Sequence, residues 1–115
     1  MDTNILSATA MIGNNVKNLA GEDLGKIEDL MLNVKSGRVS YAVLSFGGFL
    51  GIGNKLFAVP WPALDLSTEE KCFYLDIEKK YLENAPGFER ERWPNLADPE
   101  WRRSIHDYYG IDPYW

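Results

Sequence analysis

The chain has 115 residues, of which 45% are hydrophobic and 25% are charged. A chain of this length folds as one domain of ordinary size, and this composition excludes disordered, collagen-like and coiled-coil proteins. The chain contains one cysteine, Cys72, and one histidine, His106. These counts exclude an intramolecular disulfide and a Cys/His-rich structural zinc site.

The charge pattern bears on partners and location. The formal net charge is −5, and the acidic excess lies in residues 59–115, which hold twelve acids and seven bases. Nucleic-acid binding needs clustered Lys and Arg, so this balance argues against a nucleic-acid partner.

Residues 43–53 are too few and too rich in glycine to cross a bilayer as a helix. Asp2 stands where a secretory signal would carry a base, and we therefore expect a cytoplasmic protein without a membrane span.

Two short helical segments are predicted outside the C-terminal region. Residues 7–12 form a helical turn capped by Ser7, before the chain becomes extended at Val16. Residues 77–82 fit a second short helix, which ends at the sequence Ala-Pro-Gly over residues 85–87.

A strand with an irregularity is predicted over residues 25–34. Ile27 is out of phase with the later apolar residues, which indicates a β-bulge near Glu28 or Asp29. The residues expected to share one strand face are Leu30, Leu32 and Val34.

The middle of the chain predicts further short strands. Residues 35–37 form a hairpin connection into the strongest β segment, residues 39–46. The other strands are expected at residues 56–59, 65–67 and 72–75. About six short strands at hairpin spacing predict a mostly β protein, built as a small antiparallel β-barrel or sandwich.

The C-terminal region predicts a helix with clear ends. Asp98 is the N-cap, Pro99 is the first helical residue, and Gly110 follows the last turn. The apolar stripe expected on this helix consists of Trp101, Ile105 and Tyr108.

Aromatic residues are dense in the same region. Eight of the fifteen aromatic residues lie in the last 35 positions, which is incompatible with a solvated tail. Either the barrel or a second subunit must cover them. We therefore divide the chain into a β domain, residues 1–88, and an aromatic-rich helical extension, residues 89–115.

Residues 47–55 form a glycine-rich loop that lacks the spacing of a dinucleotide or P-loop motif. Its apolar side chains, Phe49, Leu50 and Ile52, form either a lid over the core or a contact patch for another chain. We leave both alternatives open.

Other candidate residues favour structural interpretations. The carboxylate pairs Glu22/Asp23, Glu28/Asp29 and Glu69/Glu70 are adjacent in sequence, and neighbouring strand residues point to opposite faces. His106 lies outside the apolar stripe and is expected to be exposed. Cys72 is expected to be a small apolar filler and Trp61 a core residue. We predict no catalytic, cofactor-binding or metal-binding residue.

Four motifs in order resemble the PRC-barrel family. They are the runs GKIEDL at 25–30, GRVSYAV at 37–43, GGFLGIG at 47–53 and AVPW at 58–61. The resemblance covers about residues 7–88. It implies a compact, strongly bent β-barrel, with an extension similar to that of stand-alone bacterial members. It also implies docking onto other proteins, and no catalytic residue of the barrel itself.

We therefore expect a non-enzymatic protein-interaction or assembly module that forms a homodimer or binds another protein. The predicted interaction surface consists of Phe49, Leu50, Ile52, Trp101, Tyr108 and Trp115. One alternative is a small-ligand or catalytic pocket around Trp61 and Tyr41 with nearby carboxylates. Another is an RNA- or ribosome-associated factor.

Overall fold

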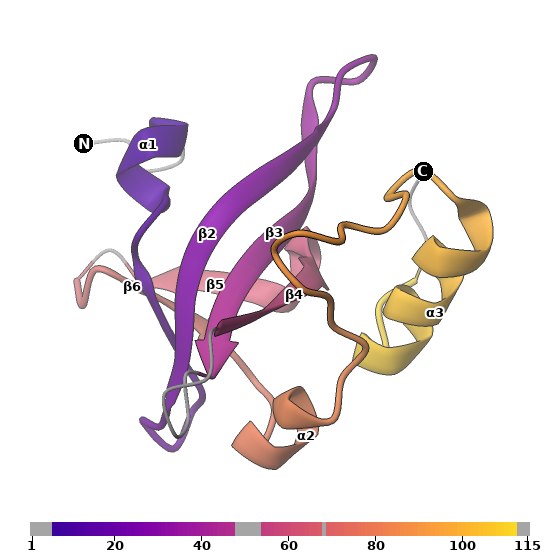
Figure 1. The fold of residues 1–115 in the computed structure, drawn as a ribbon. Coiled ribbons are helices and arrows are strands. Elements are labelled where there is room, and N and C mark those ends of the chain that lie inside the picture. Colours follow the sequence, from indigo (N-terminus) through magenta and orange to yellow (C-terminus); the bar gives the residue numbers. More distant parts are fainter. Residues whose placement is uncertain (1–5, 48–53, 68, 113–115) are drawn as a thin grey trace.

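A computed structural model describes residues 6–47, 54–67 and 69–112 of the chain. Within these ranges the protein is mostly β, with short helices and a longer C-terminal helix (Figure 1). The elements in chain order are α1 (Ala8–Met11), β1 (Asn15–Lys17), β2 (Asp23–Asn33), β3 (Arg38–Gly47), β4 (Asn54–Pro60), η2 (Trp61–Ala63), β5 (Leu64–Ser67), β6 (Cys72–Leu75), α2 (Lys79–Glu83) and α3 (Pro99–Tyr109). No helix in these ranges is both long enough and apolar enough to cross a membrane.

The strands form one six-stranded sheet that curls into a half-barrel, in the order β4-β3-β2-β1-β6-β5. The pairs β2–β3, β3–β4, β1–β2 and β5–β6 are antiparallel, which confirms the predicted hairpins. The pair β1–β6 is parallel, with Val16 opposite Phe73. This pairing joins the two ends of the strand sequence and was not predicted.

The predicted bulge in β2 is confirmed. Ile27 pairs with Leu44 and Asp29 pairs with Val43, so Glu28 is an extra residue in the ladder. The bulge brings Ile27 and Leu30 to the same buried side although they are three positions apart.

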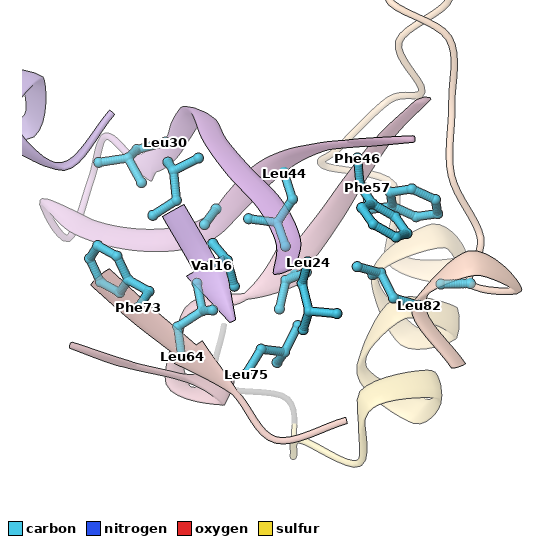
Figure 2. Close-up of a cluster of buried hydrophobic side chains, with 14 residues drawn as sticks. Val16, Leu24, Leu30, Leu44, Phe46, Phe57, Leu64, Phe73, Leu75 and Leu82 are labelled. Carbon is cyan, nitrogen blue, oxygen red and sulfur yellow. The ribbon is translucent and has the colours of Figure 1, made fainter. Parts of the chain in front are cut away.

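The main core lies on the concave side of the curled sheet. Figure 2 shows side chains from β1, β2, β3, β4 and β6 converging there, with Leu82 of α2 at one end. Its most deeply buried members include Val16, Leu24, Ile27 and Leu44, each at most 1% exposed. Cys72 is a free cysteine that is buried, as expected of a small apolar filler.

The strand predicted over residues 25–34 ends one residue earlier, at Asn33, so Val34 lies in the turn and not on the strand face expected for it. Leu30 is buried, whereas Leu32 is 58% exposed and Val34 is 90% exposed. Strand periodicity indicates which residues share a face, but not how far the strand runs beyond the core. The β2–β3 hairpin extends past the rest of the sheet (Figure 1), so its last apolar side chains have no core to enter.

The C-terminal helix begins and ends as predicted. The Asp98 carboxylate accepts a hydrogen bond from the Glu100 backbone N–H at 3.2 Å. Pro99 is the first helical residue, and Gly110 adopts the left-handed conformation at φ +68°. At α1, Ser7 is the N-cap residue as predicted, but its side chain bonds to the Thr9 hydroxyl instead of a helix N–H.

Candidate functional site

The outer, convex side of β3 and β4 carries a second buried cluster. Alternate residues of the two strands point away from the main core and are covered by α3 and by the segment that precedes it (Figure 1). The buried members of this outer cluster are Tyr41, Val43, Leu56, Ala58, Phe88 and Ile105. Strands β3 and β4 are therefore buried on both faces, and the C-terminal helix is held against the sheet of its own chain.

The backbone fixes the segment that leads to α3. Phe88 and Leu56 exchange two backbone hydrogen bonds, at 2.8 and 2.9 Å, along the outer edge of β4. Gly87 lies so close to β4 that a Cβ atom there would be 2.9 Å from the Leu56 carbonyl oxygen. The outer edge of β4 is thus partly protected, by its own chain, from pairing with a strand of another chain.

The prediction that His106 is exposed was wrong, because its side chain is only 1% exposed. His106 Nδ1 lies 3.0 Å from the Ile111 carbonyl oxygen, and Nε2 lies 3.1 Å from the Tyr41 hydroxyl. Arg102, His106 and Tyr109 form a second row at i, i+4 and i+7, beside the predicted apolar stripe. From the sequence alone, this spacing could have indicated that the buried face of α3 is wider than the apolar stripe.

The direction of these hydrogen bonds follows from donor chemistry. A carbonyl oxygen only accepts, so neutral His106 carries its proton on Nδ1 and accepts from the Tyr41 hydroxyl at Nε2. The Tyr41 oxygen in turn accepts from Arg102 Nε at 3.4 Å. Hydrogen bonds therefore connect His106, Tyr41 and Arg102 in series. Through them, Tyr41 of β3 links the end of α3 to the first turns of the same helix.

Burial shifts the pKa values of both buried partners. It lowers the pKa of His106, and the nearby Arg102 charge acts in the same direction, while the bond to the Ile111 carbonyl opposes the shift. Burial also raises the pKa of Tyr41, against a smaller opposing effect of Arg102. Both groups are thus held in the uncharged forms that their hydrogen bonds require.

A pair of tyrosines joins α2 to α3. The rings of Tyr81 and Tyr108 stack with their centroids 4.3 Å apart. Each hydroxyl donates to the backbone carbonyl of the other residue, and both distances are 2.5 Å. Trp101 makes an edge contact with the Tyr41 ring, with centroids 5.5 Å apart. The predicted surface residues Trp101 and Tyr108 therefore both make contacts within the chain and are partly buried.

The far end of the β2–β3 hairpin, residues 31–40, forms a two-stranded arm. β4 last pairs with β3 at Tyr41, and β1 pairs with β2 no further along than Lys26. Within the described parts of the chain, the strands of this arm pair only with each other. The arm projects beyond the half-barrel (Figure 1). Its exposed side chains include Leu32 and Val34.

A pocket of about 250 Å³ lies between the hairpin arm and the start of α3. The residues that line it are apolar (Met31, Leu32, Leu96 and Ala97) and polar (Asn33, Ser40, Tyr41 and Arg102). The turn over residues 95–98, closed by a hydrogen bond from the Asp98 N–H to the Asn95 carbonyl, places Leu96 and Ala97 opposite the arm.

A comparison with known protein families identifies the family of this chain. The model of the PRC-barrel domain matches residues 4–82 of the chain. The chain belongs to the PRC-barrel family. No curated protein matches the chain at a significant level. The matched residues end within α2, so α3 and His106 lie outside them, whereas Tyr41, the strand partner of His106, lies within them.

Within this PRC-barrel, the predicted loop residues Phe49, Leu50 and Ile52, together with Trp115, lie outside the described residues. Trp61 packs against the main core and lies 5.9 Å from the Phe73 ring between centroids, while remaining partly exposed. Tyr41 belongs to the outer cluster. Trp61 and Tyr41 therefore contact different clusters, and the pocket lined by Tyr41 does not include Trp61.

The predicted carboxylate pairs of the PRC-barrel take structural roles where they are described. The Asp23 carboxylate accepts from the Gly25 N–H at 3.0 Å, and the Asp29 carboxylate accepts from the Leu30 N–H at 2.8 Å. Glu28 forms an ion pair with Arg90. These contacts support the bulged strand and anchor the segment that leads to α3.

Proposed function

We propose that this PRC-barrel is a non-enzymatic docking module and that its first partner is a second copy of the same chain. The observation that carries the proposal is the hairpin arm, which holds Leu32 at 58% and Val34 at 90% exposure beyond the sheet. Apolar side chains gathered on a projecting element are typical of a protein contact.

The free energy gained by burying apolar side chains supports a protein contact at the arm. Moving one Leu or Val side chain from water into a packed interface contributes about 1.5–3 kcal/mol. A two-stranded hairpin is also marginally stable by itself. A partner that packs on the arm would therefore bury Leu32 and Val34 and stabilise the hairpin at the same time.

The charge distribution favours a second copy as the partner. Residues 30–64 contain three bases, Lys35, Arg38 and Lys55, and no acid, although the whole chain has a net charge of −5. Lys35 and Arg38 are exposed on the arm. The remaining surface of an identical chain is acidic and therefore complementary to the arm.

The other predicted surface residues extend this proposal. Trp101 and Tyr108 retain some exposed surface beside their contacts with Tyr41 and Tyr81. The contribution of Phe49, Leu50, Ile52 and Trp115 to association stays a prediction.

Sedimentation velocity over a wide concentration range tests self-association. The wild-type chain is expected to form a dimer as concentration rises, and the double variant Leu32→Ser/Val34→Ser is expected to remain a monomer. Leu19→Ser is a matched control, because Leu19 is 69% exposed at a turn away from the arm. A wild-type chain that stays monomeric at high micromolar concentration, or a double variant that dimerises like wild type, contradicts the proposal.

Salt dependence tests the electrostatic part separately. Dimerisation is expected to weaken with added salt, because exposed charges are screened within about 8–10 Å at physiological ionic strength. Lys35→Ser should weaken the dimer, whereas Lys80→Ser removes the same charge from the exposed side of α2 and should not. Equal effects of the two variants would show that net charge, and not the arm, controls association.

A further inference from the structure

The pocket between the hairpin arm and α3 is continuous with the surface of the arm. Half of the residues that line it belong to the arm, namely Met31, Leu32, Asn33 and Ser40. Leu96 and Ala97 line it from the turn before α3. Leu32 is 58% exposed, and Leu96 is only partly buried. A partner that packs on the arm therefore also reaches the apolar side chains of the pocket.

The size of the pocket suits one apolar side chain. Its volume of about 250 Å³ lies below the range of about 300–1,000 Å³ that is usual for small-molecule sites. A cavity of about 150 Å³ already holds benzene, and a valine side chain is smaller than benzene. An uncharged side chain also makes no demand on Arg102, the charged residue of the lining.

Val34 is the candidate side chain, because it is the most exposed apolar residue of the arm. It is 90% exposed at the arm tip, which we define as the turn over residues 34–37, and it does not line the pocket of its own chain. It follows Leu32 by two positions, which is a distance of about 7 Å in an extended chain. A two-fold axis beside the arm would place each Val34 at the pocket of the other chain, since such a contact is the same for both copies.

The charges beside Val34 and beside the pocket are opposite. Lys35 follows Val34 and is exposed at the arm tip. The start of α3 carries the exposed acids Asp98 and Glu100, directly after the pocket residue Ala97. Entry of Val34 into the pocket of another copy would bring its Lys35 towards these acids, and the two-fold relation would do so twice. This complementarity favours a second copy as the occupant.

We propose that the pocket receives the arm tip of a second copy, so that Val34 of each chain packs against Leu32, Leu96 and Ala97 of the other. This inference rests on the self-association proposed above and names the surface to which the arm binds. One contact then buries the exposed side chains of Val34 and Leu32 and places Lys35 beside the start of α3.

Disulfide cross-linking between two differently tagged variants tests the contact. Val34→Cys and Ala97→Cys are mixed under mild oxidation, and their mixed disulfide is expected to be the main cross-linked product, because a disulfide needs Cα atoms within about 7 Å. Leu19→Cys replaces Val34→Cys in the matched control, since Leu19 is also exposed. The native Cys72 is buried and should not compete. Equal cross-linking in the control, or a main product that joins two Val34→Cys chains, overturns the inference.

A bulky side chain at the pocket tests whether the pocket must be open. Ala97→Trp should fill it and weaken dimerisation at least tenfold in sedimentation velocity. Ala20→Trp is the matched control. Both alanines are exposed turn residues, and each backbone N–H donates to an Asn side chain two positions earlier, at 3.1 Å. Unchanged dimerisation of Ala97→Trp, or an equal loss in both variants, overturns the inference.

Reversed charges test which residues meet across the two chains. Lys35→Glu and Glu100→Lys should each weaken dimerisation, because either change places like charges opposite each other at both contacts. A mixture of the two variants should recover it, since the mixed dimer has one native pair and one reversed pair. Glu83→Lys replaces Glu100→Lys in the control mixture, because Glu83 is exposed on α2 and the change in net charge is the same. Recovery no greater than in the control mixture overturns the inference.

The proposed self-association and the pocket contact fail in distinguishable ways. A wild-type chain that stays monomeric contradicts both. A dimer that is lost in Leu32→Ser/Val34→Ser, but shows no mixed disulfide between positions 34 and 97, overturns only the pocket contact.

Discussion

The two faces of strands β3 and β4 are both buried, but by different means. The inner face enters an apolar cluster supplied mainly by the other strands and α2, with Tyr108 and Tyr109 of α3 packed against it. The outer face combines apolar side chains with the buried polar contacts of Tyr41, His106 and Arg102. Apolar packing provides stability without direction, whereas hydrogen bonds require one arrangement of the partners. The inner face thus stabilises the barrel, and the outer face fixes the position of α3.

The two faces also differ in their relation to the family. The inner cluster is made mainly from residues that match the PRC-barrel model, which ends at residue 82. Phe88, Ile105 and His106 on the outer face lie beyond it. The C-terminal segment therefore adds a cover to the barrel and contributes Arg102 to the lining of the pocket.

Substitution of an inner residue gives the largest expected effect. Leu44→Ala should lower the free energy of unfolding by about 3–5 kcal/mol, because Leu44 is fully buried and a cavity remains. Hydrogen exchange should show reduced protection throughout the sheet. Ile105→Ala is the outer-face counterpart, and its loss of protection should be concentrated in α3. Equal loss across the whole molecule in both variants would contradict the distinction between the faces.

A glycine of the inner barrel gives the next largest effect. Gly25 has φ +105°, and a Cβ atom there would lie 2.3 Å from the Ser45 carbonyl oxygen. Gly25→Ala should cost about 2–4 kcal/mol in urea unfolding, from backbone strain and steric overlap together. Gly37→Ala also has positive φ but no nearby atom, and should cost only about 1 kcal/mol. Similar losses in both variants would show that close approach of the strands is unimportant.

The same chemical change should have different effects at two buried hydroxyls, that of Tyr41 in the outer cluster and that of Tyr109, which packs against both clusters. Tyr41→Phe removes the donor to buried His106 and should cost about 1–3 kcal/mol. The buried Tyr109 hydroxyl has no hydrogen-bond partner among the residues that the structure describes. Tyr109→Phe should therefore leave stability unchanged or raise it by up to about 1 kcal/mol. Thermal or urea unfolding measures both, and a clear loss in Tyr109→Phe would contradict this assignment.

The outer face should also make stability depend on pH. The pKa of His106 is lowered by burial from its ordinary value of 6.5, so the unfolded chain binds a proton at a higher pH than the folded chain. The free energy of unfolding should therefore fall as pH decreases below about 6.5, the ordinary histidine value. His106→Gln should remove this part of the dependence. An identical pH profile for wild type and variant in urea titrations would contradict the buried, neutral histidine.

The smallest effect on folding is expected at the hairpin arm. Val34 is 90% exposed, so Val34→Ser should change stability by no more than about 0.5 kcal/mol. A larger loss under conditions where the chain is monomeric would show that the arm packs within the chain.

The elements whose signals are local were predictable. The ends of α3 follow from Asp98, Pro99 and Gly110, and the bulge at Glu28 follows from the phase of Ile27. Their physical causes, capping and strand alternation, act over a few residues.

The features that depend on distant residues were not predictable in the same way. One hydrogen-bond partner of His106 is Tyr41, which is 65 positions away, so helix periodicity alone did not show that this histidine is buried. The parallel pairing of β1 with β6 and the projection of the arm depend on how the whole sheet curls. The pocket combines the arm with the start of α3, and no local pattern brings these two segments together.

Hydrogen exchange of the wild-type chain at several protein concentrations tests the proposed docking arm most directly. The amides of residues 31–40 should become more protected as concentration rises, because a second copy covers the arm and its unpaired strand edges. Amides of the inner core should remain unchanged under the same conditions. Association that is accompanied by new protection elsewhere, with none in residues 31–40, would contradict the proposal that the arm is the docking surface.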